Sequence, residues 1–257
     1  MRIIGGITAH YGSDYIGYAV KSIYEFVDEL WISFCTLPWG HRSTPIPNPD
    51  SIEKMREAAH IFGDPHNKIH FEQHDFWPDE GTHRDHITAL ATDRGADLLL
   101  RTDADEIWDQ ESLAGWLEIA SRMEAHYYSL PFLHLWRSFD YYCDDDCRPL
   151  RIVNCKSWQV EHNFPPLIKE KVFHMGYARK PADVYYKALV HAHQEGDWKT
   201  WYQNVFLRFP TVTQNVHPTC VRPKPDGSNW WDIKPFDRYR LPNFMQSHPF
   251  WNMEIIQ

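Results

Sequence analysis

The chain is poor in cysteine, has no long apolar run and carries a deficit of positive charge. Five of its 257 residues are cysteine, an odd number, and no secretory signal is recognisable. We therefore expect free thiols in a reducing, cytoplasmic compartment rather than a disulfide-stabilised secreted fold. No apolar stretch reaches the roughly 18 residues that a membrane-spanning helix needs. The formal net charge of -9 opposes unaided binding to nucleic acid or to an anionic membrane.

Aromatic side chains, in contrast, are abundant. They make up 15% of the residues and include 12 Trp, which offer flat faces for stacking on sugars or bases as well as material for a core. The surplus of aromatics near the C-terminus leaves a homo-oligomer as an open alternative to a monomer. The length suits one large α/β domain with an ample core.

The first half of the chain alternates short apolar runs with amphipathic, helix-like segments. The expected strands cover residues 2–8, 30–36, 68–72 and 97–101, and the expected helices between them cover 14–30, 52–62 and 82–94. Strands separated by helices imply an α/β fold with a mostly parallel sheet flanked by helices. Such a sheet has a crevice at the carboxyl ends of its strands.

The second half is less regular. Helices are expected at 110–124, 182–193 and 198–209, and strands at 127–135, 150–154 and 172–175. Prolines recur from residue 210 to 249, which indicates extended loop. The simplest organisation is one domain over residues 1–209, followed by an irregular, Pro- and aromatic-rich C-terminal extension over 210–257 that packs on the same domain.

Two carboxylates one residue apart, Asp103 and Asp105, follow the apolar run at residues 96–100. At the end of a buried strand they can converge on a hard divalent cation, which prefers oxygen ligands. Mg²⁺ or Mn²⁺ held in this way can bind a diphosphate and stabilise it as a leaving group. An acidic chain contains such a spacing by chance, and the triplet at 144–146 is a second match. Only the first pair has a hydrophobic strand before it.

The segment from Asp103 to Glu106, closing an apolar strand, resembles the DxD motif of GT-A glycosyltransferases, and in particular of their family-2-like group. Residues 81–85 open the preceding expected helix, where that family often places an arginine. Residues 172–181 resemble its later H-x-G-Y element. The resemblance covers the layout of roughly residues 1–190. It implies a GT-A (Rossmann-like) fold and metal-dependent transfer of a sugar from a UDP- or other nucleotide-sugar donor to a glycan or another hydroxyl acceptor.

The resemblance also implies a ligand set for the metal. Asp105 should coordinate the ion directly, and Asp103 should contact the ribose or the ion. His174 is a candidate further ligand. Because an imidazole suits Mn²⁺ better than Mg²⁺, Mn²⁺ is the expected ion and Mg²⁺ the alternative.

Donor-binding residues are implied in the same way. Arg84, Arg179 and Lys180 are candidates to neutralise the diphosphate, with arginine offering bidentate geometry. At the end of the first expected strand, the base and ribose of the donor would meet Thr8, His10 and Tyr11. Relatives often carry an acidic residue after the second strand. This sequence has none there, so Asp75, after the third strand, is the candidate for that role.

Transfer with inversion requires a general base that deprotonates the acceptor hydroxyl. Glu106 lies beside the metal motif and is expected either to orient ligands or to serve as this base. Asp145, in the acidic triplet, is the other candidate. If neither acts as a base, the enzyme retains configuration, and the sequence leaves both outcomes open.

Two other classes of function compete with glycosyl transfer. A metal-dependent hydrolase acting on a phosphorylated or nucleotide substrate would combine the aspartates with His191 and His193. Those histidines fall in a helix-like stretch, where positions two apart face different directions. A non-catalytic carbohydrate- or nucleotide-binding module would explain the aromatics but not the carboxylate pair. A nucleic-acid acceptor is disfavoured by the net charge, although the basic segment 148–187 keeps it open.

Overall fold

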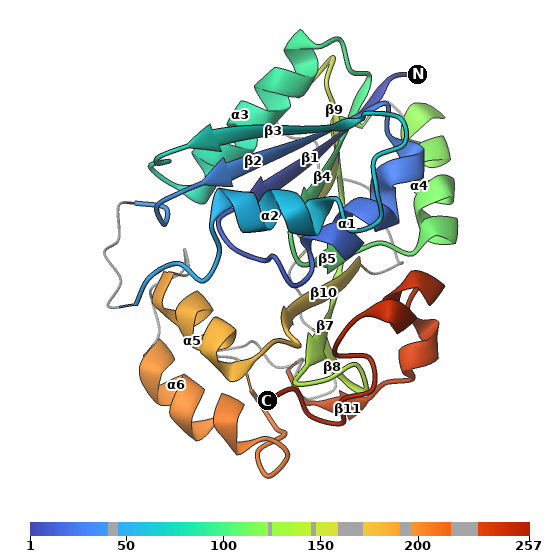
Figure 1. The fold of residues 1–257 in the computed structure, drawn as a ribbon. Helices are drawn as coiled ribbons and strands as arrows, with labels where there is room; N and C mark the ends of the chain where they lie inside the picture. The colour runs from blue at the N-terminus through green and yellow to red at the C-terminus, as the bar shows by residue number, and fades with distance from the viewer. Residues whose placement is uncertain (41–45, 123–124, 145–147, 159–171, 191–196, 217–230) are drawn as a thin grey trace. The chain divides into compact units, whose positions relative to one another are not determined.

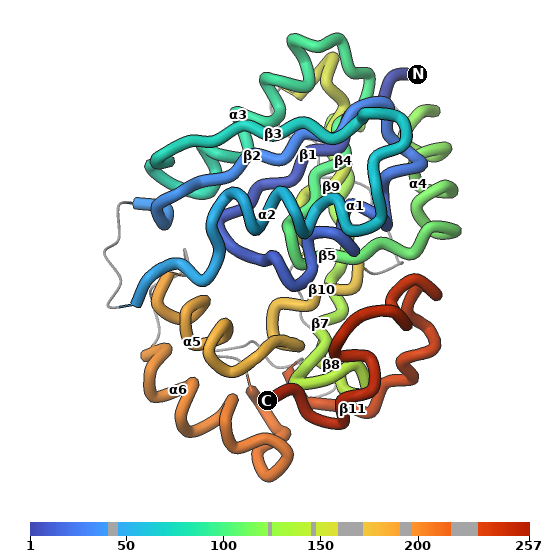
Figure 2. Tube along the Cα trace, in the orientation of Figure 1, coloured from blue at the N-terminus to red at the C-terminus, as the bar shows by residue number. Residues whose placement is uncertain are grey.

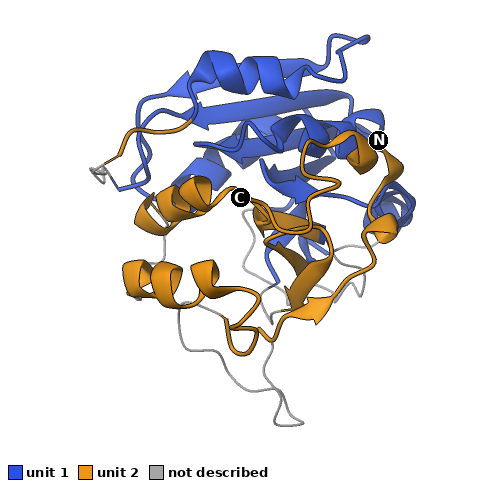
Figure 3. Cartoon of the chain, turned by 60° about the horizontal axis from the view of Figure 1, so that its bottom comes forward, with its two compact units in different colours: residues 1–43, 50–131, 148–172 blue, residues 44–49, 132–147, 173–257 orange. Residues whose placement is uncertain are grey.

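The structure is a computed structural model that describes residues 1–40, 46–122, 125–144, 148–158, 172–190, 197–216 and 231–257. The chain forms two compact units (Figure 3). Unit 1 comprises residues 1–43, 50–131 and 148–172, and unit 2 comprises 44–49, 132–147 and 173–257. The sequence suggested a boundary between a domain over 1–209 and an extension over 210–257. Unit 2 contains residues from both of these segments. Within the described ranges, no helix combines the length and apolar content that crossing a bilayer requires.

Unit 1 is built on a six-stranded sheet with the order β3-β2-β1-β4-β9-β6. Figures 1 and 2 label its strands β3, β2, β1, β4 and β9. Neighbours among the first four strands are parallel, β9 runs antiparallel to β4, and β6 runs antiparallel to β9. This mostly parallel sheet confirms the expected α/β class. The strands are β1 (Ile3–Ala9), β2 (Glu29–Cys35), β3 (Ile69–His74), β4 (Leu98–Asp103), β6 (Tyr127–Ser129) and β9 (Leu150–Asn154).

Helices cover both faces of this sheet. A Cβ atom added to Gly5 would lie 3.2 Å from Ile23 of α1, whereas one added to Gly6 would lie 2.3 Å from Ile87 of α3. Because consecutive strand residues point to opposite faces, α1 and α3 pack on opposite sides of β1. Only glycine permits the close approach of α3 at Gly6. The unit 1 helices are α1 (Ile16–Ile23), α2 (Ile52–Ala59), α3 (Glu80–Asp93) and α4 (Gln110–Arg122).

Element boundaries differ from the sequence expectations where a local signal acts. The helix expected over 14–30 ends at Ile23 in a short 3₁₀ turn, and Val27 is already extended. Helix α3 begins two residues early because the Asp79 carboxylate accepts the Thr82 N–H at 2.7 Å and caps it. The strand expected over 127–135 is divided in two at Pro131, which cannot donate to a strand ladder.

Among its described residues, unit 2 contains strands in the order β11-β8-β7-β10, two α-helices and a core rich in aromatic rings. In its described part, residues 231–257 form 3₁₀ turns and one two-residue strand. They are tied to the unit by Arg238, whose guanidinium pairs with Asp140. The elements are β7 (Phe132–Trp136), β8 (Tyr141–Asp144), β10 (Val172–Tyr177), β11 (Lys234–Pro235), α5 (Pro181–Val190) and α6 (Trp198–Asn204). The aromatic core includes Trp136, Tyr177, Trp198, Trp201, Phe206, Phe209 and Trp231.

Candidate functional site

One row of facing residues crosses the four parallel strands of unit 1 near their carboxyl ends. The register places Asp103 of β4 opposite Thr8 of β1, Thr8 opposite Ser33 of β2, and Ser33 opposite Glu72 of β3. Residues that face one another across strands point to the same side of a sheet. We call these four residues the polar row.

Helix α3 contacts three of the four members of the polar row, each on a different strand. The buried residues of α3 are therefore both polar and apolar: His83 and Thr88 are buried as well as Ile87 and Ala91. The polar row thus lies on the α3 side of the sheet. The three contacts are His83 Nε2 to Ser33 Oγ (2.9 Å), Arg84 Nη2 to Asp103 Oδ2 (2.9 Å) and His86 Nε2 to Glu72 Oε1 (2.7 Å).

The centre of this row lies at the topological switch point of the sheet. From β1 the chain continues to β2 and β3 on one side, and then returns to β4 on the other. Thr8 and Asp103 are adjacent across this point, where the Thr8 hydroxyl donates to Asp103 Oδ1 at 3.2 Å. Open α/β sheets bind ligands in the crevice that such a reversal creates at the carboxyl ends of the strands.

Asp103 is saturated with donors. Besides Thr8, it accepts from Arg84 Nη2 at 2.9 and 3.2 Å and from Arg151 Nη2 at 2.9 Å. These four contacts match the roughly four lone-pair sites of a carboxylate. Asp103 is therefore a fixed anchor between two guanidinium groups, and any further ligand has to share or displace one of these donors.

Asp105 lies in the turn between β4 and the short strand β5 (Glu106–Ile107). Its side chain is partly exposed, whereas its neighbours Ala104 and Glu106 are buried. Carboxylate oxygens are the donors that Mg²⁺ and Mn²⁺ prefer. The donor chemistry of Asp105 therefore fits a hard divalent cation, and its role as the direct ligand stays a prediction.

Glu106 and Arg151 form a buried ion pair behind the aspartates. The Arg151 guanidinium contacts both Glu106 and Asp103, and Glu106 Oε2 accepts the Asp103 N–H at 3.2 Å. Burial raises the pKa of Glu106 against the opposing effect of Arg151. Burial lowers the pKa of Arg151, but the carboxylates of Glu106 and Asp103 outweigh it, so the guanidinium stays charged.

The geometry bears on the two roles expected for Glu106. Its side chain is 0% exposed and is engaged by Arg151. A wholly buried carboxylate has no path to an acceptor hydroxyl, so the arrangement favours the orienting role over that of the base. Sequence reasoning did not single out Arg151 as its partner, although it noted the basic segment that contains this residue.

The end of β1 presents His10 and Tyr11 differently. His10 is buried, and its Nδ1 lies 2.7 Å from the Cys35 carbonyl oxygen. Burial lowers the pKa of His10, which keeps the imidazole neutral near pH 7. Tyr11 is partly exposed and meets the His10 ring edge-on, with centroids 5.9 Å apart. Of the two side chains, that of Tyr11 is the more exposed.

Asp50 fixes the loop that follows β1. Its Oδ2 accepts the N–H groups of Gly12 and Ser13 at 2.7 and 2.9 Å, and its Oδ1 accepts the Ser13 hydroxyl at 2.6 Å. Gly12 has a φ of 130°, a conformation that favours glycine. Helix α2 is capped by Ser51, whose hydroxyl accepts the Lys54 N–H at 3.2 Å. Asp50 instead reaches across to the loop.

The remaining predicted residues belong to both units. Asp75 is exposed after β3. In unit 2, His174 is buried, stacks on Phe132 and has its Nδ1 2.8 Å from His134 Nδ1. Arg179 is also buried in unit 2, whereas Lys180 is exposed before α5. The roles of these residues beside the unit 1 aspartates stay predictions. Asp145, His191 and His193 lie outside the described residues.

No protein-family model and no curated protein matches the sequence. Among solved structures, S. aureus TarS is similar at 10% identity and a TM-score of 0.44, over 73% of this chain and 63% of that chain. Glucosyl-3-phosphoglycerate synthase from Mycobacterium tuberculosis, in complex with Mn²⁺, UDP and phosphoglyceric acid, is similar at 14% identity and a TM-score of 0.34, over 53% and 43%. CMP:2-keto-3-deoxy-manno-octonic acid synthetase with CTP is similar at 12% identity and a TM-score of 0.35, over 62% and 76%.

The chain thus spans less than two thirds of the length of the first two of these proteins. At TM-scores below 0.5, the likenesses carry no argument about activity. The α/β class is shown by the mostly parallel sheet of unit 1.

Proposed function

We propose that the protein is a metal-dependent glycosyltransferase that moves a sugar from a nucleotide-sugar donor to an acceptor hydroxyl. One observation carries the proposal. Asp103 and Asp105 lie at the carboxyl end of β4, next to β1, at the switch point of a mostly parallel sheet. This is where such sheets bind nucleotides, and the Asp105 carboxylate offers the oxygen ligands preferred by the ion that accompanies a diphosphate.

In this proposal Asp105 holds the cation, which is Mn²⁺ or alternatively Mg²⁺. When bound, the ion supplies positive charge that stabilises the nucleoside diphosphate as it leaves. Asp103, held by Arg84 and Arg151, contacts the donor ribose and keeps the turn that carries Asp105 in place. Arg84 is partly exposed, so it also places a positive charge near the phosphates.

The other expected residues complete the proposal. Tyr11 stacks on the nucleobase, with Thr8 and His10 supporting the ribose side and Asp75 contacting the base. His174 as a further metal ligand, Arg179 and Lys180 as phosphate contacts, and Asp145 as the general base are proposed from the family resemblance alone.

Nucleotide binding tests the proposal directly. We expect calorimetric titration with UDP, GDP and dTDP to show binding of one of them that requires Mn²⁺. Asp105→Asn should abolish the Mn²⁺ requirement or the binding itself. The matched control is Asp85→Asn, because Asp85 is an exposed aspartate on α3 that should not affect either measurement. Binding of equal strength without metal, or in the Asp105 variant, would contradict the assignment.

Turnover is the second test. A screen of nucleotide-sugars for slow hydrolysis should identify the donor, since transferases commonly leak the activated sugar to water. Asp105→Asn should eliminate this turnover while leaving the circular dichroism spectrum and the unfolding temperature unchanged. A variant that hydrolyses the donor as fast as the wild type would remove Asp105 from the reaction.

A further inference from the structure

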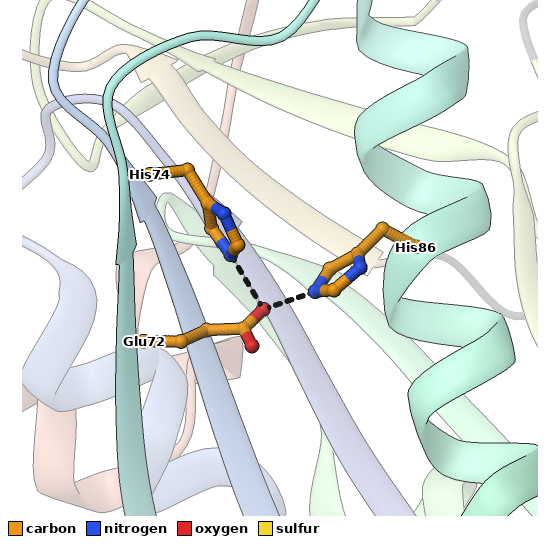
Figure 4. A group of neighbouring side chains, drawn as sticks. All are labelled: Glu72, His74 and His86. Atoms are coloured by element: carbon orange, nitrogen blue, oxygen red, sulfur yellow. Dashed lines mark hydrogen bonds and ion pairs between the residues drawn. The ribbon is translucent and has the colours of Figure 1, made fainter.

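A second group of metal-ligand side chains lies in unit 1, at the outer end of the polar row. Glu72 and His74 are on the edge strand β3, and His86 is on α3 (Figure 4). One ligand atom from each residue lies within 4.8 Å of the other two. We propose that these three side chains form a binding site for Zn²⁺.

The distances require little rearrangement to accept the ion. Glu72 Oε1 lies 2.7 Å from His86 Nε2 and 3.2 Å from His74 Nε2. Two ligands of a tetrahedral zinc ion, each about 2.0–2.1 Å from the metal, are roughly 3.3–3.4 Å apart. The Glu72 and His74 atoms are already near that separation, and small side-chain rotations bring His86 to it.

A buried nitrogen gives independent support. His74 Nε2 has almost no exposed area and no hydrogen-bond partner in the part of the chain that the structure describes. It lies at ion-pair distance from Glu72, but not in hydrogen-bonding geometry. Leaving a buried polar atom unsatisfied is costly, and coordination of a cation would satisfy it.

The surroundings hold both imidazoles in place. The Trp77 ring packs against His74 and His86, with centroids 4.8 and 4.9 Å apart, and the two imidazole centroids are themselves 4.9 Å apart. The side chains remain 19 to 30% exposed, so an ion can enter from solvent. Pre-positioned ligands lose less conformational freedom on binding.

The ligand chemistry separates this site from the aspartate pair. Two imidazoles and one carboxylate suit Zn²⁺, and three protein ligands leave a fourth position for water. The aspartates offer only oxygen, which suits Mg²⁺ or Mn²⁺. Glu72 is three strands from Asp103, or roughly 14 Å at about 4.8 Å per strand. The proposed ion would link β3 to α3, and the inference does not depend on the proposed function.

Zinc titration tests the site. After treatment with a chelator, the full-length protein is titrated with ZnCl₂ by calorimetry and with Co²⁺ as a spectroscopic probe of tetrahedral coordination. We expect one site and a zinc-dependent rise in the unfolding temperature. His74→Gln and His86→Gln should each weaken binding by more than the roughly 10–100-fold that loss of an outer-shell partner costs.

The chain offers a matched control on the same strand. His70 lies on the same face of β3 and stacks on Trp31, outside the proposed ligand set. His70→Gln and Asp105→Asn should bind zinc like the wild type. Glu72→Gln keeps the size of the side chain, so it tests the ligand charge if a histidine variant fails to fold. Equal zinc affinity in the wild type, Glu72→Gln and the two histidine variants would overturn the proposal, as would tighter binding of Mn²⁺ than of Zn²⁺ at this site.

Discussion

Arg151 is the residue on which the aspartate site depends most. A single guanidinium, 2% exposed, contacts both Asp103 and Glu106. Asp103 keeps Arg84 as a second partner, but Glu106 is wholly buried. Loss of Arg151 therefore leaves a carboxylate in the protein interior without its counter-charge.

We predict that Arg151→Met lowers the free energy of unfolding by about 3–5 kcal/mol, the usual cost of breaking one side of a buried ion pair. Adding Glu106→Gln to this variant removes the stranded charge and should restore part of the loss. Urea denaturation of the single and double variants measures the difference. A double variant no more stable than Arg151→Met would show that Glu106 is not ionised in the folded protein.

Asp50 is a second residue that stabilises a segment far from it in the sequence, the loop at Gly12 and Ser13. Burial alone would raise the pKa of Asp50, but hydrogen bonds from Lys54, Ser13 and Gly12 hold it below its usual range. The loop after β1 is therefore stabilised by the ionised form of the Asp50 carboxylate.

Asp50→Ala should destabilise the protein by about 1–3 kcal/mol, because it leaves buried N–H donors of the loop unsatisfied. Ser51→Ala is the comparison, since it removes only the cap of α2 and should cost about 1 kcal/mol. Thermal unfolding of the two variants at pH 7 decides the order. If Ser51→Ala proves the more harmful, the loop does not depend on Asp50.

Among the elements, α3 packs closely on the central strand of the unit 1 sheet. It approaches β1 at Gly6, where an added Cβ would also lie 3.0 Å from Leu99. Helix α4 shows the opposite situation, because a Cβ on its exposed Gly115 meets nothing within 4 Å.

Gly6→Ala should therefore destabilise unit 1 by about 1–3 kcal/mol through overpacking. Gly115→Ala should stabilise it by about 0.5–1 kcal/mol, since alanine is favoured over glycine inside a helix. Chemical denaturation of the two variants gives shifts of opposite sign. If both variants changed the free energy of unfolding in the same direction, the close contact between α3 and Gly6 would be contradicted.

Elements with a clear hydrophobic pattern were predictable from the sequence. Element boundaries that depend on contacts between distant residues were not. The four parallel strands fall within two residues of their expected bounds, and β1, β2 and β4 each contain a distinct apolar run. The helix expected over 14–30 ends early since Asp28 bonds to β1: its carboxylate accepts the Ile3 N–H and its own N–H donates to the Ile3 carbonyl, both at 2.8 Å. Such a pairing across 25 residues leaves no trace in the local pattern.

At the scale of the whole molecule, stability should depend on pH through His83. This side chain is fully buried between Ser33, Trp39 and Trp77. Burial lowers the pKa of His83 to about 3, and the nearby His74, His86 and Arg84 charges add to the effect. The unfolded chain binds a proton at this residue below about pH 6.5, whereas the folded chain does not until about pH 3.

The folded state therefore loses stability as the pH falls from about 6.5 toward 3, by at most about 1.4 kcal/mol per pH unit from this residue. His83→Gln should show a shallower decline over the same window. Urea denaturation at several pH values between 4 and 7 gives both slopes. Parallel slopes for the two proteins would mean that His83 is protonated in the folded state.

The candidate site was predictable only in its local part. Asp103 and Asp105 are recognisable because the motif and its strand are contiguous. Arg151 is 48 residues from Asp103 and meets it only through the antiparallel pairing of β9 with β4. The group of Glu72, His74 and His86 was missed for a similar reason, since a chain with 16 His gives no sign of which of them face one another.

The contacts of α3 with the polar row constrain how unit 1 can change. The helix contacts Glu72 at the outer edge of the sheet and Asp103 near its centre. Adding or deleting one residue ahead of the helix turns its side chains by about 100° if the loop does not absorb it. Such a change would withdraw His83, Arg84 and His86 from their partners together. The contacts at the edge and at the centre of the sheet therefore depend on the same rotation of α3. A redesign that changes this rotation to suit one contact would also displace the other.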